Sequence, residues 1–277
     1  KTDIQLRLPK MSAFETKDAY WDFVTTVRNE RRWIFDGKAG NFLAAVRAAS
    51  KSRAQPLKSG RRLYRAQVGS AFAPENEMGI EEEHPYPETR MIPDPKCIKN
   101  GGRANPPGFA YLYLATTPET ALAEMRPWVR ESLTLAIFEI QQNIKLVVCQ
   151  AGTEDWEERL FEEKPSADNI EKYVWNDISK AFARPVSRED QESAYLPTQI
   201  LAEAFKAEGF DGLAYRSGLE RGTNVVLFDV RVAKLTHRFV YTLKKVQYDF
   251  EAVPNYAIYR RKDGGGECIT EIHTESP

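Results

Sequence analysis

The stretch GGRANPPGFAYLYLATTPETALAEMRP, residues 101–127, decides the fold class because it passes from loop to strand to helix. Its first part is rich in Gly and Pro, and the run from Tyr111 to Ala115 predicts a short strand. Thr117 as N-cap and Pro118 in the first turn then predict a helix that carries Glu124. Such a junction can point a carboxylate, an aromatic ring and an arginine into one cleft.

The remaining elements favour an α+β fold. Apolar residues at helical spacing predict further helices, at 17–32, 41–49 (with Asn41 as N-cap), 167–184 and 196–208. Other segments predict strands, at 63–66, 133–140, 145–149, 212–215 and 224–231. We expect 133–140 to pair with 145–149, and 51–62 to be a linker. Because the helices do not alternate strictly with the strands, a doubly wound parallel sheet is disfavoured.

Composition excludes several functional classes. A chain of 277 residues with 42% hydrophobic content can form one large domain or two small ones. Its net charge of -1 shows no basic excess, so we expect no direct nucleic-acid binding. No apolar run approaches the roughly 18 to 20 residues that span a bilayer, so no membrane association is expected. The cysteines Cys97, Cys149 and Cys268 match neither zinc nor disulfide spacing, which predicts reduced thiols, a cytoplasmic location and no metal.

An acidic, Pro-rich stretch, ENEMGIEEEHPYPETRMIPDP, occupies residues 75–95. It is either a solvated insertion, which is what charged runs usually are, or a lid that orders on binding.

Three kinds of side chain can carry chemistry, and each also has a structural interpretation. Glu124 is either a solvated helix residue or a positioned acid, and Glu is rarely buried without a partner. Arg65, inside the strand-like LYRAQ, is a surface residue or a fork for a phosphate or carboxylate. Tyr111 and Tyr113 share one face of a strand, as core aromatics or as a stacking platform.

Familiar catalytic motifs are absent. The loop before Tyr111 has Arg103 as its only charge and lacks the Gly patterns of Rossmann and P-loop nucleotide sites. Ser217 is not in a G-x-S-x-G turn, and no histidine has an obvious claim to act as its base. A Ser/His/Asp hydrolase and a metalloenzyme are therefore both disfavoured.

Arg65 in LYRAQ, Glu124 in ETALAE and Ser217 in YRSG, in this order, resemble the RES domain family, named for its Arg, Glu and Ser. GGRANPPGFAYLYLATTPETALAE looks like its loop-strand-helix signature, and TQILAEAFKAEGFDGLAYRSG followed by NVVLFD looks like its C-terminal half. The resemblance covers residues 63–240. It does not cover the first sixty residues, which look helical and charged, or the tail. We therefore expect a helical N-terminal extension (1–60), a RES domain (61–245) with an acidic insertion near 70–97, and a tail (246–277).

The resemblance implies an ADP-ribosyltransferase-like fold of the diphtheria-toxin kind, with a mixed β core and flanking helices. It implies that NAD⁺ is a substrate rather than a cofactor, and that phosphorolysis or hydrolysis degrades it, with inorganic phosphate as co-substrate of phosphorolysis. It also implies a toxin or defence effector silenced by a helix-turn-helix antitoxin. Protein mono-ADP-ribosylation is the alternative in the same fold, and a non-catalytic interaction module is the alternative of another class. A homo-oligomer is left open.

The resemblance also implies roles for single residues. Glu124 would stabilise the oxocarbenium-like ribose as the nicotinamide–ribose bond breaks. Arg65 would bind a phosphate of NAD⁺ or the incoming phosphate. Ser217 would hydrogen-bond the ligand or orient Glu124.

The other predicted ligand contacts come from four positions, two aromatic and two in the loop. Tyr113 would stack on nicotinamide or line its pocket, and Tyr64 would contact the dinucleotide. Arg103 and Asn105 are either further ligand contacts or structural residues of their loop.

Overall fold

The computed structural model describes residues 12–73, 81–149, 166–184, 191–247, 255–260 and 267–272. The described residues up to Leu243 belong to one compact unit, and those from Lys244 onward belong to another. The second unit contains a hairpin of β11 (Asn255–Arg260) and β12 (Glu267–Ile272).

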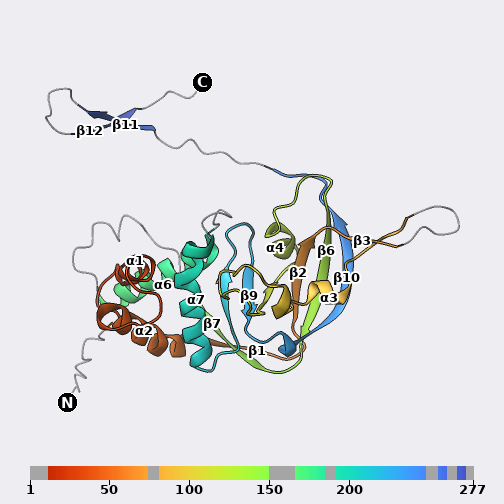
Figure 1. Ribbon diagram of the computed structural model, residues 1–277, viewed down its shortest axis with the longest axis horizontal. Coiled ribbons are helices and arrows are strands. Elements are labelled where there is room, and N and C mark those ends of the chain that lie inside the picture. Colours follow the sequence, from red (N-terminus) through yellow and green to blue (C-terminus); the bar gives the residue numbers. More distant parts are fainter. Residues whose placement is uncertain are drawn as a thin grey trace, which may run out of the picture. The chain divides into compact units, whose positions relative to one another are not determined.

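An eight-stranded mixed sheet runs through the first unit (Figure 1), in the order β1-β7-β8-β9-β5-β2-β6-β10. Only β7 and β8 pair in parallel, and every other neighbour is antiparallel. The strands are β1 (Ala54–Leu57), β2 (Arg62–Val68), β5 (Leu112–Ala115), β6 (Ser132–Ile140), β7 (Ile144–Val148), β8 (Gly212–Arg216), β9 (Thr223–Leu227) and β10 (Ala233–Thr242). A separate two-stranded piece joins β3 (Ala71–Phe72) to β4 (Glu83–His84). The α+β class is confirmed.

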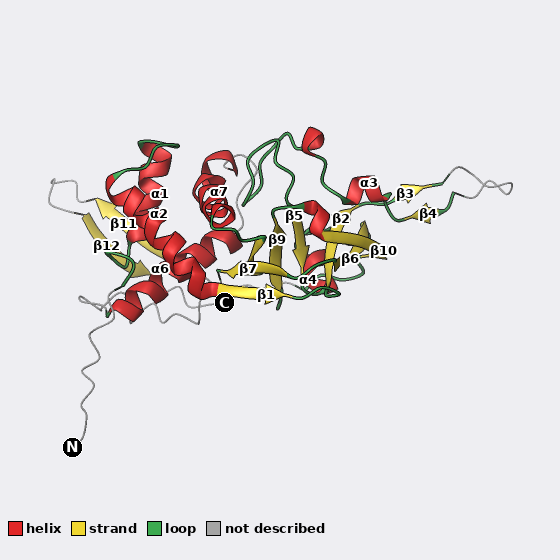
Figure 2. Cartoon of the chain, turned by 90° about the horizontal axis from the view of Figure 1, so that it is seen from below, coloured by secondary structure: helices red, strands yellow, loops and turns green. Residues whose placement is uncertain are grey.

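Four helices pack together on one face of this sheet (Figures 1 and 2): α1 (Ala19–Asn29), α2 (Gly37–Ser50), α6 (Ala167–Ala183) and α7 (Gln191–Ala207). Their fully buried side chains, such as Phe23, Trp175 and Phe205, share one apolar core with Val147 and Leu213 of the sheet. The helices before residue 60 are therefore built into the core of the first unit.

Two further short helices lie among the described residues of the first unit. The helix α4 (Pro118–Ala123) follows β5 and packs through Ala121 against Ala66 and Leu135. The helix α3 (Glu88–Met91) lies near the 3-10 turn η2 (Pro95–Cys97), and its Met91 packs with Leu112 and Leu114. The other 3-10 turns are η1 (Lys51–Arg53) and η3 (Val230–Val232).

The run YLYL at residues 111–114 alternates between two apolar cores, one on each face of the sheet. Tyr111 and Tyr113 face the four-helix layer, whereas Leu112 and Leu114 belong to the core of the opposite face. The predicted common face of the two tyrosines is confirmed.

The structure corrects two predictions near the strands. Residues 51–62 are not a linker, because η1 and β1 lie within them; β1 is an edge strand, where Pro56 is tolerated. The segments 133–140 and 145–149 do not pair. Both edges of β6 are taken, by β2 and β10, while β7 pairs with β1 and β8.

The N-terminus of α2 also differs from the prediction. The helix begins at Gly37 with Asp36 in the N-cap position. Asn41 lies inside it, and its Nδ2 donates a hydrogen bond to Glu15 Oε1 over 3.1 Å. The polar side chain that marked a helix start thus ties the helix to the preceding segment.

Candidate functional site

Glu124 lies directly after α4, in its C-cap position, and its carboxylate is held by two donors. Ser217 Oγ and Asn224 Nδ2 both donate to Oε1, over 2.8 and 2.6 Å. Within the described part of the chain Oε2 has no hydrogen-bond partner. One oxygen is therefore fixed while the other is free to face a ligand.

The sequence around α4 explains how the carboxylate reaches this place. Thr117 Oγ1 accepts a hydrogen bond from Thr120 N over 3.2 Å and Pro118 occupies the first turn, as predicted. Gly222 lies against α4, since a Cβ there would be 2.0 Å from Thr120 Oγ1. Glycine at this position lets the turn that follows Ser217 approach the helix closely enough for Ser217 to reach Glu124.

A pocket of about 260 Å³ opens beside Glu124, between α4 and the sheet. Its floor comes from β2, β5, β8 and β9. The lining residues are Tyr64, Arg65, Ala66, Arg103, Tyr113, Leu114, Ala115, Ala121, Glu124, Met125, Tyr215 and Asn224.

Arg65 lies next to the weakest strand pairing in the sheet. There β2 pairs with β5 at a single position, Tyr64 opposite Ala115. Its Nη1 donates to the Tyr113 carbonyl over 3.3 Å. The side chain is partly exposed, yet Nε is shielded from solvent and has no hydrogen-bond partner among the described residues. Burial lowers the pKa of Arg65 to about 10. A bound anion would supply the missing acceptor.

A hydrogen-bonded loop fixes the ring of Tyr113. The Tyr113 hydroxyl donates to Asn105 Oδ1 over 2.6 Å and accepts from Ala104 N over 2.9 Å, and Asn105 Nδ2 donates to Phe109 O. Burial raises the pKa of Tyr113, so the hydroxyl stays neutral. A Cβ on Gly102 would lie 2.6 Å from both Asn105 Oδ1 and the Tyr113 hydroxyl. The glycine is required by this close approach.

The same loop is fastened to the helix layer. Arg103 Nη1 donates to Phe182 O over 2.8 Å and to Arg184 O, at the C-terminal end of α6, where a cation is favoured. From α7, Thr198 Oγ1 donates to Arg103 O, and Gln199 Nε2 donates to Gly102 O and Asn105 O. Thr198 and Gln199 thus hold the loop that in turn fixes the position of Tyr113.

Most of the predicted site residues meet at this pocket. Five of them line it, namely Tyr64, Arg65, Arg103, Tyr113 and Glu124. Asn105 and Ser217 do not line it but hydrogen-bond to side chains that do.

Sequence reasoning missed Asn224 and Tyr215, which both line the pocket. Asn224 stands at the start of the apolar run NVVLF, and the structure shows that it is buried. Because a buried amide needs hydrogen-bond partners, an Asn in such a run is a signal in the sequence that could have identified it. Tyr215 offered no comparable signal.

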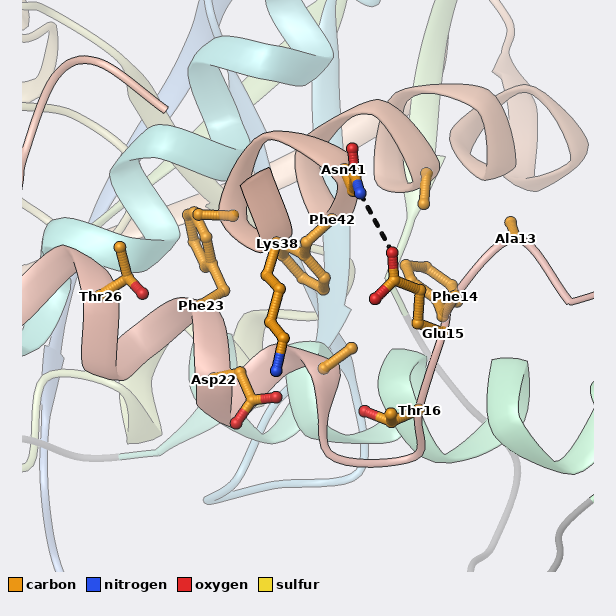
Figure 3. Close-up of a pocket in the computed structure, with 13 residues that line it drawn as sticks. Ala13, Phe14, Glu15, Thr16, Asp22, Phe23, Thr26, Lys38, Asn41 and Phe42 are labelled. Atoms are coloured by element: carbon orange, nitrogen blue, oxygen red, sulfur yellow. Dashed lines mark hydrogen bonds between the residues drawn. The ribbon is translucent and has the colours of Figure 1, made fainter. Parts of the chain in front are cut away.

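A second cavity, of about 110 Å³, lies between residues 13–16, α1 and α2 (Figure 3). Figure 3 shows Asn41 and Glu15 joined by their hydrogen bond, with Phe23 and Phe42 among the lining side chains. Its lining includes neither Glu124 nor the groups that hold it. The Glu124 pocket is therefore the candidate site.

The described residues show neither a membrane-spanning helix nor a cluster of metal ligands. None of their helices is both long and apolar enough to cross a membrane. The described residues also contain no group of three or more His, Cys, Asp or Glu side chains that could hold a metal ion.

The fold is a mixed sheet with flanking helices, and its pocket is lined by a carboxylate, an arginine and a tyrosine. A model of the RES domain matches residues 77–251, more than half of the chain, and the chain belongs to the RES domain family. The match includes Glu124, Ser217 and Asn224 and begins after Arg65.

Among solved structures, the chain is similar to one in the crystal structure of the M. tuberculosis MbcT-MbcA toxin-antitoxin complex. The two chains are 12% identical, with a TM-score of 0.38, over 71% of this chain and 92% of that one. Curated proteins gave no match.

Proposed function

We propose that this protein cleaves the nicotinamide–ribose bond of NAD⁺ in the Glu124 pocket, by phosphorolysis or hydrolysis. The observation that carries the proposal is the carboxylate of Glu124, held on one oxygen by Ser217 and Asn224 beside Arg65 and Tyr113. This is the arrangement needed to stabilise a cation that forms on a sugar ring.

The chemistry assigns a role to each group. As the bond breaks, its electron pair stays on the nicotinamide nitrogen, and the ribose carbon becomes oxocarbenium-like. The carboxylate of Glu124 stabilises that positive charge, and Ser217 and Asn224 fix the carboxylate's position. Nicotinamide leaves as a neutral molecule, so it needs no general acid.

The pocket walls bind the rest of the substrate. Tyr113 lines the nicotinamide side, and Tyr64 contacts the dinucleotide. Arg65 pairs with a phosphate of NAD⁺ or with the incoming nucleophile. Asn105 acts through its hydrogen bond to Tyr113, whereas Arg103 both anchors the loop that holds Tyr113 and lines the pocket, where it can contact the ligand.

An oxygen of phosphate or water then adds to the ribose carbon. Phosphate gives ADP-ribose-1″-phosphate, whereas water gives ADP-ribose and releases a proton. The fold to which we assign this chemistry is ADP-ribosyltransferase-like.

The test compares Glu124→Gln with Glu119→Gln, an exposed glutamate in the first turn of the same helix. Glu124→Gln is expected to abolish nicotinamide release with the fold intact, and Glu119→Gln to retain it. Full activity of Glu124→Gln would remove Glu124 from the mechanism.

Product analysis with and without phosphate separates the outcomes. ADP-ribose-1″-phosphate indicates phosphorolysis, ADP-ribose indicates hydrolysis, and label from NAD⁺ in a macromolecule indicates protein mono-ADP-ribosylation. No nicotinamide release from folded protein, and no NAD⁺ binding by calorimetry, would instead favour a non-catalytic interaction module.

The biological role that follows is that of a cytoplasmic toxin or defence effector that depletes NAD⁺, with a helix-turn-helix antitoxin as partner. Induced expression in a bacterial host is expected to lower cellular NAD⁺ and stop growth. Growth arrest of equal strength with Glu124→Gln would refute this role.

A further inference from the structure

A groove of about 660 Å³ adjoins the Glu124 pocket, and Arg65 and Met125 line both. One wall is β2, through Arg65, Gln67 and Val68. The other is the segment 89–98, which includes part of α3 and all of η2. The groove and the pocket therefore meet at the place where β2 and β5 are joined by only one pair of residues.

The volumes of the Glu124 pocket and the adjoining groove indicate that each holds a different part of the substrate. Small-molecule sites usually enclose about 300 to 1,000 Å³. The Glu124 pocket, at about 260 Å³, is below that range, so it accommodates the reacting end of a dinucleotide rather than the whole molecule. The adjoining groove has the room that the pocket lacks.

The groove also carries polar groups without partners. Gln67 Oε1 and Arg65 Nε are both shielded from solvent, and neither has a hydrogen-bond partner among the described residues. Because burying a polar atom without a partner is costly, an acceptor and a donor left so in one groove point to a ligand.

The charge of the groove suits a phosphate-bearing ligand. Arg90 lines it and is exposed, with its guanidinium 4.3 Å from the centroid of the Tyr86 ring. The one acidic lining residue, Asp94, already accepts a hydrogen bond from Lys96 N. Although the stretch 75–95 is acidic, it thus presents an arginine to the groove.

We propose that this groove binds the adenosine monophosphate half of the dinucleotide, an inference that rests on the proposed function. Arg65, at the junction, contacts the pyrophosphate. Gln67 turns its amide toward the groove so that Oε1 accepts a hydrogen bond from the far nucleoside, and Arg90 supplies a cation for its phosphate. Gln67 and Arg90 are then specificity-determining residues that distinguish a dinucleotide from a mononucleotide.

The experiment compares NAD⁺ with nicotinamide mononucleotide, which has the same scissile bond but lacks the adenosine monophosphate half. Gln67→Ala and Arg90→Ala are the test variants. Arg61→Ala, an exposed arginine outside both cavities, is the control. Nicotinamide release is measured for both substrates, and ADP-ribose affinity is measured by calorimetry on the same samples.

We expect kcat/KM for NAD⁺ to fall about tenfold for Arg90→Ala, the loss of one charged hydrogen bond, and about two- to tenfold for Gln67→Ala, the loss of a neutral one. For both variants kcat/KM for the mononucleotide should be unchanged. ADP-ribose affinity should fall by a similar factor, and the control should match the wild type. Equal losses with both substrates, or no loss with NAD⁺, would overturn the groove assignment and leave the chemistry at Glu124 in place. No release from either substrate by the wild-type protein would overturn the proposed function itself.

Discussion

Asn224→Ala is the sharpest probe of how the carboxylate of Glu124 is held. Its amide donates to Glu124 Oε1 over 2.6 Å from the second residue of β9, at the pocket wall. Ser217→Ala is less selective, because Ser217 Oγ also accepts hydrogen bonds from Leu219 N and Glu220 N. Losing that oxygen would loosen the turn as well as the carboxylate.

The size of the effect follows from the bond that is lost. A hydrogen bond to a charged group contributes about 1.5 to 3 kcal/mol. Each 1.4 kcal/mol is a factor of ten, so kcat should fall about 10- to 150-fold if the donor fixes the reactive position of the carboxylate. The second donor, Ser217, remains, so the activity should not vanish. Because both donors bind one oxygen, the effects of removing each will not add.

The assay is nicotinamide release at saturating NAD⁺, followed by chromatography, with circular dichroism to confirm the fold. Asn143→Ala is the matched control, because its amide accepts a hydrogen bond from Ser59 N at an exposed site and does not line the pocket. A kcat for Asn224→Ala within twofold of the wild type, with Glu124→Gln inactive, would refute the holding role of Asn224.

Two further predictions test the packing around the site. Gly222→Ala places a Cβ 2.0 Å from Thr120 Oγ1, so we expect about 1 to 3 kcal/mol of destabilisation in thermal unfolding together with reduced nicotinamide release; unchanged values of both would contradict the close approach. Burial raises the pKa of Cys149 from 9.0 to about 12, so at pH 8, far below that value, its thiol is protonated. Peptide mapping after alkylation should then show Cys97, which is exposed, labelled and Cys149 unlabelled until the protein is denatured; equal labelling rates in the native protein would contradict this.

Local signals in the sequence were sufficient for α4 and for the common face of Tyr111 and Tyr113. The N-cap at Thr117 and the alternation of β5 depend only on neighbouring residues, so a single sequence contains them. The family resemblance then selected Arg65, Glu124 and Ser217 as one set, and the structure brings the three around one pocket.

The pairing of the strands and the hydrogen-bond partners of the site residues could not be predicted from local sequence in the same way. The short connection between β6 and β7 looks like a hairpin, and only the positions of β2 and β10 show that β6 has no free edge. Asn224 is one hundred positions after Glu124, so nothing local links them. The contribution of Arg90 to the groove could not be predicted from the sequence, because the stretch 75–95 around it is acidic.

The place of β2 in the sheet has a consequence for the boundaries of the folding unit. The strand lies between β5 and β6, yet it precedes residue 77, where the family match begins. A fragment cut to residues 77–251 would lack Arg65 and would leave the inner edges of β5 and β6 as open templates for another chain. Such a fragment is expected to aggregate, so the span by which the family is recognised is shorter than the span that can fold.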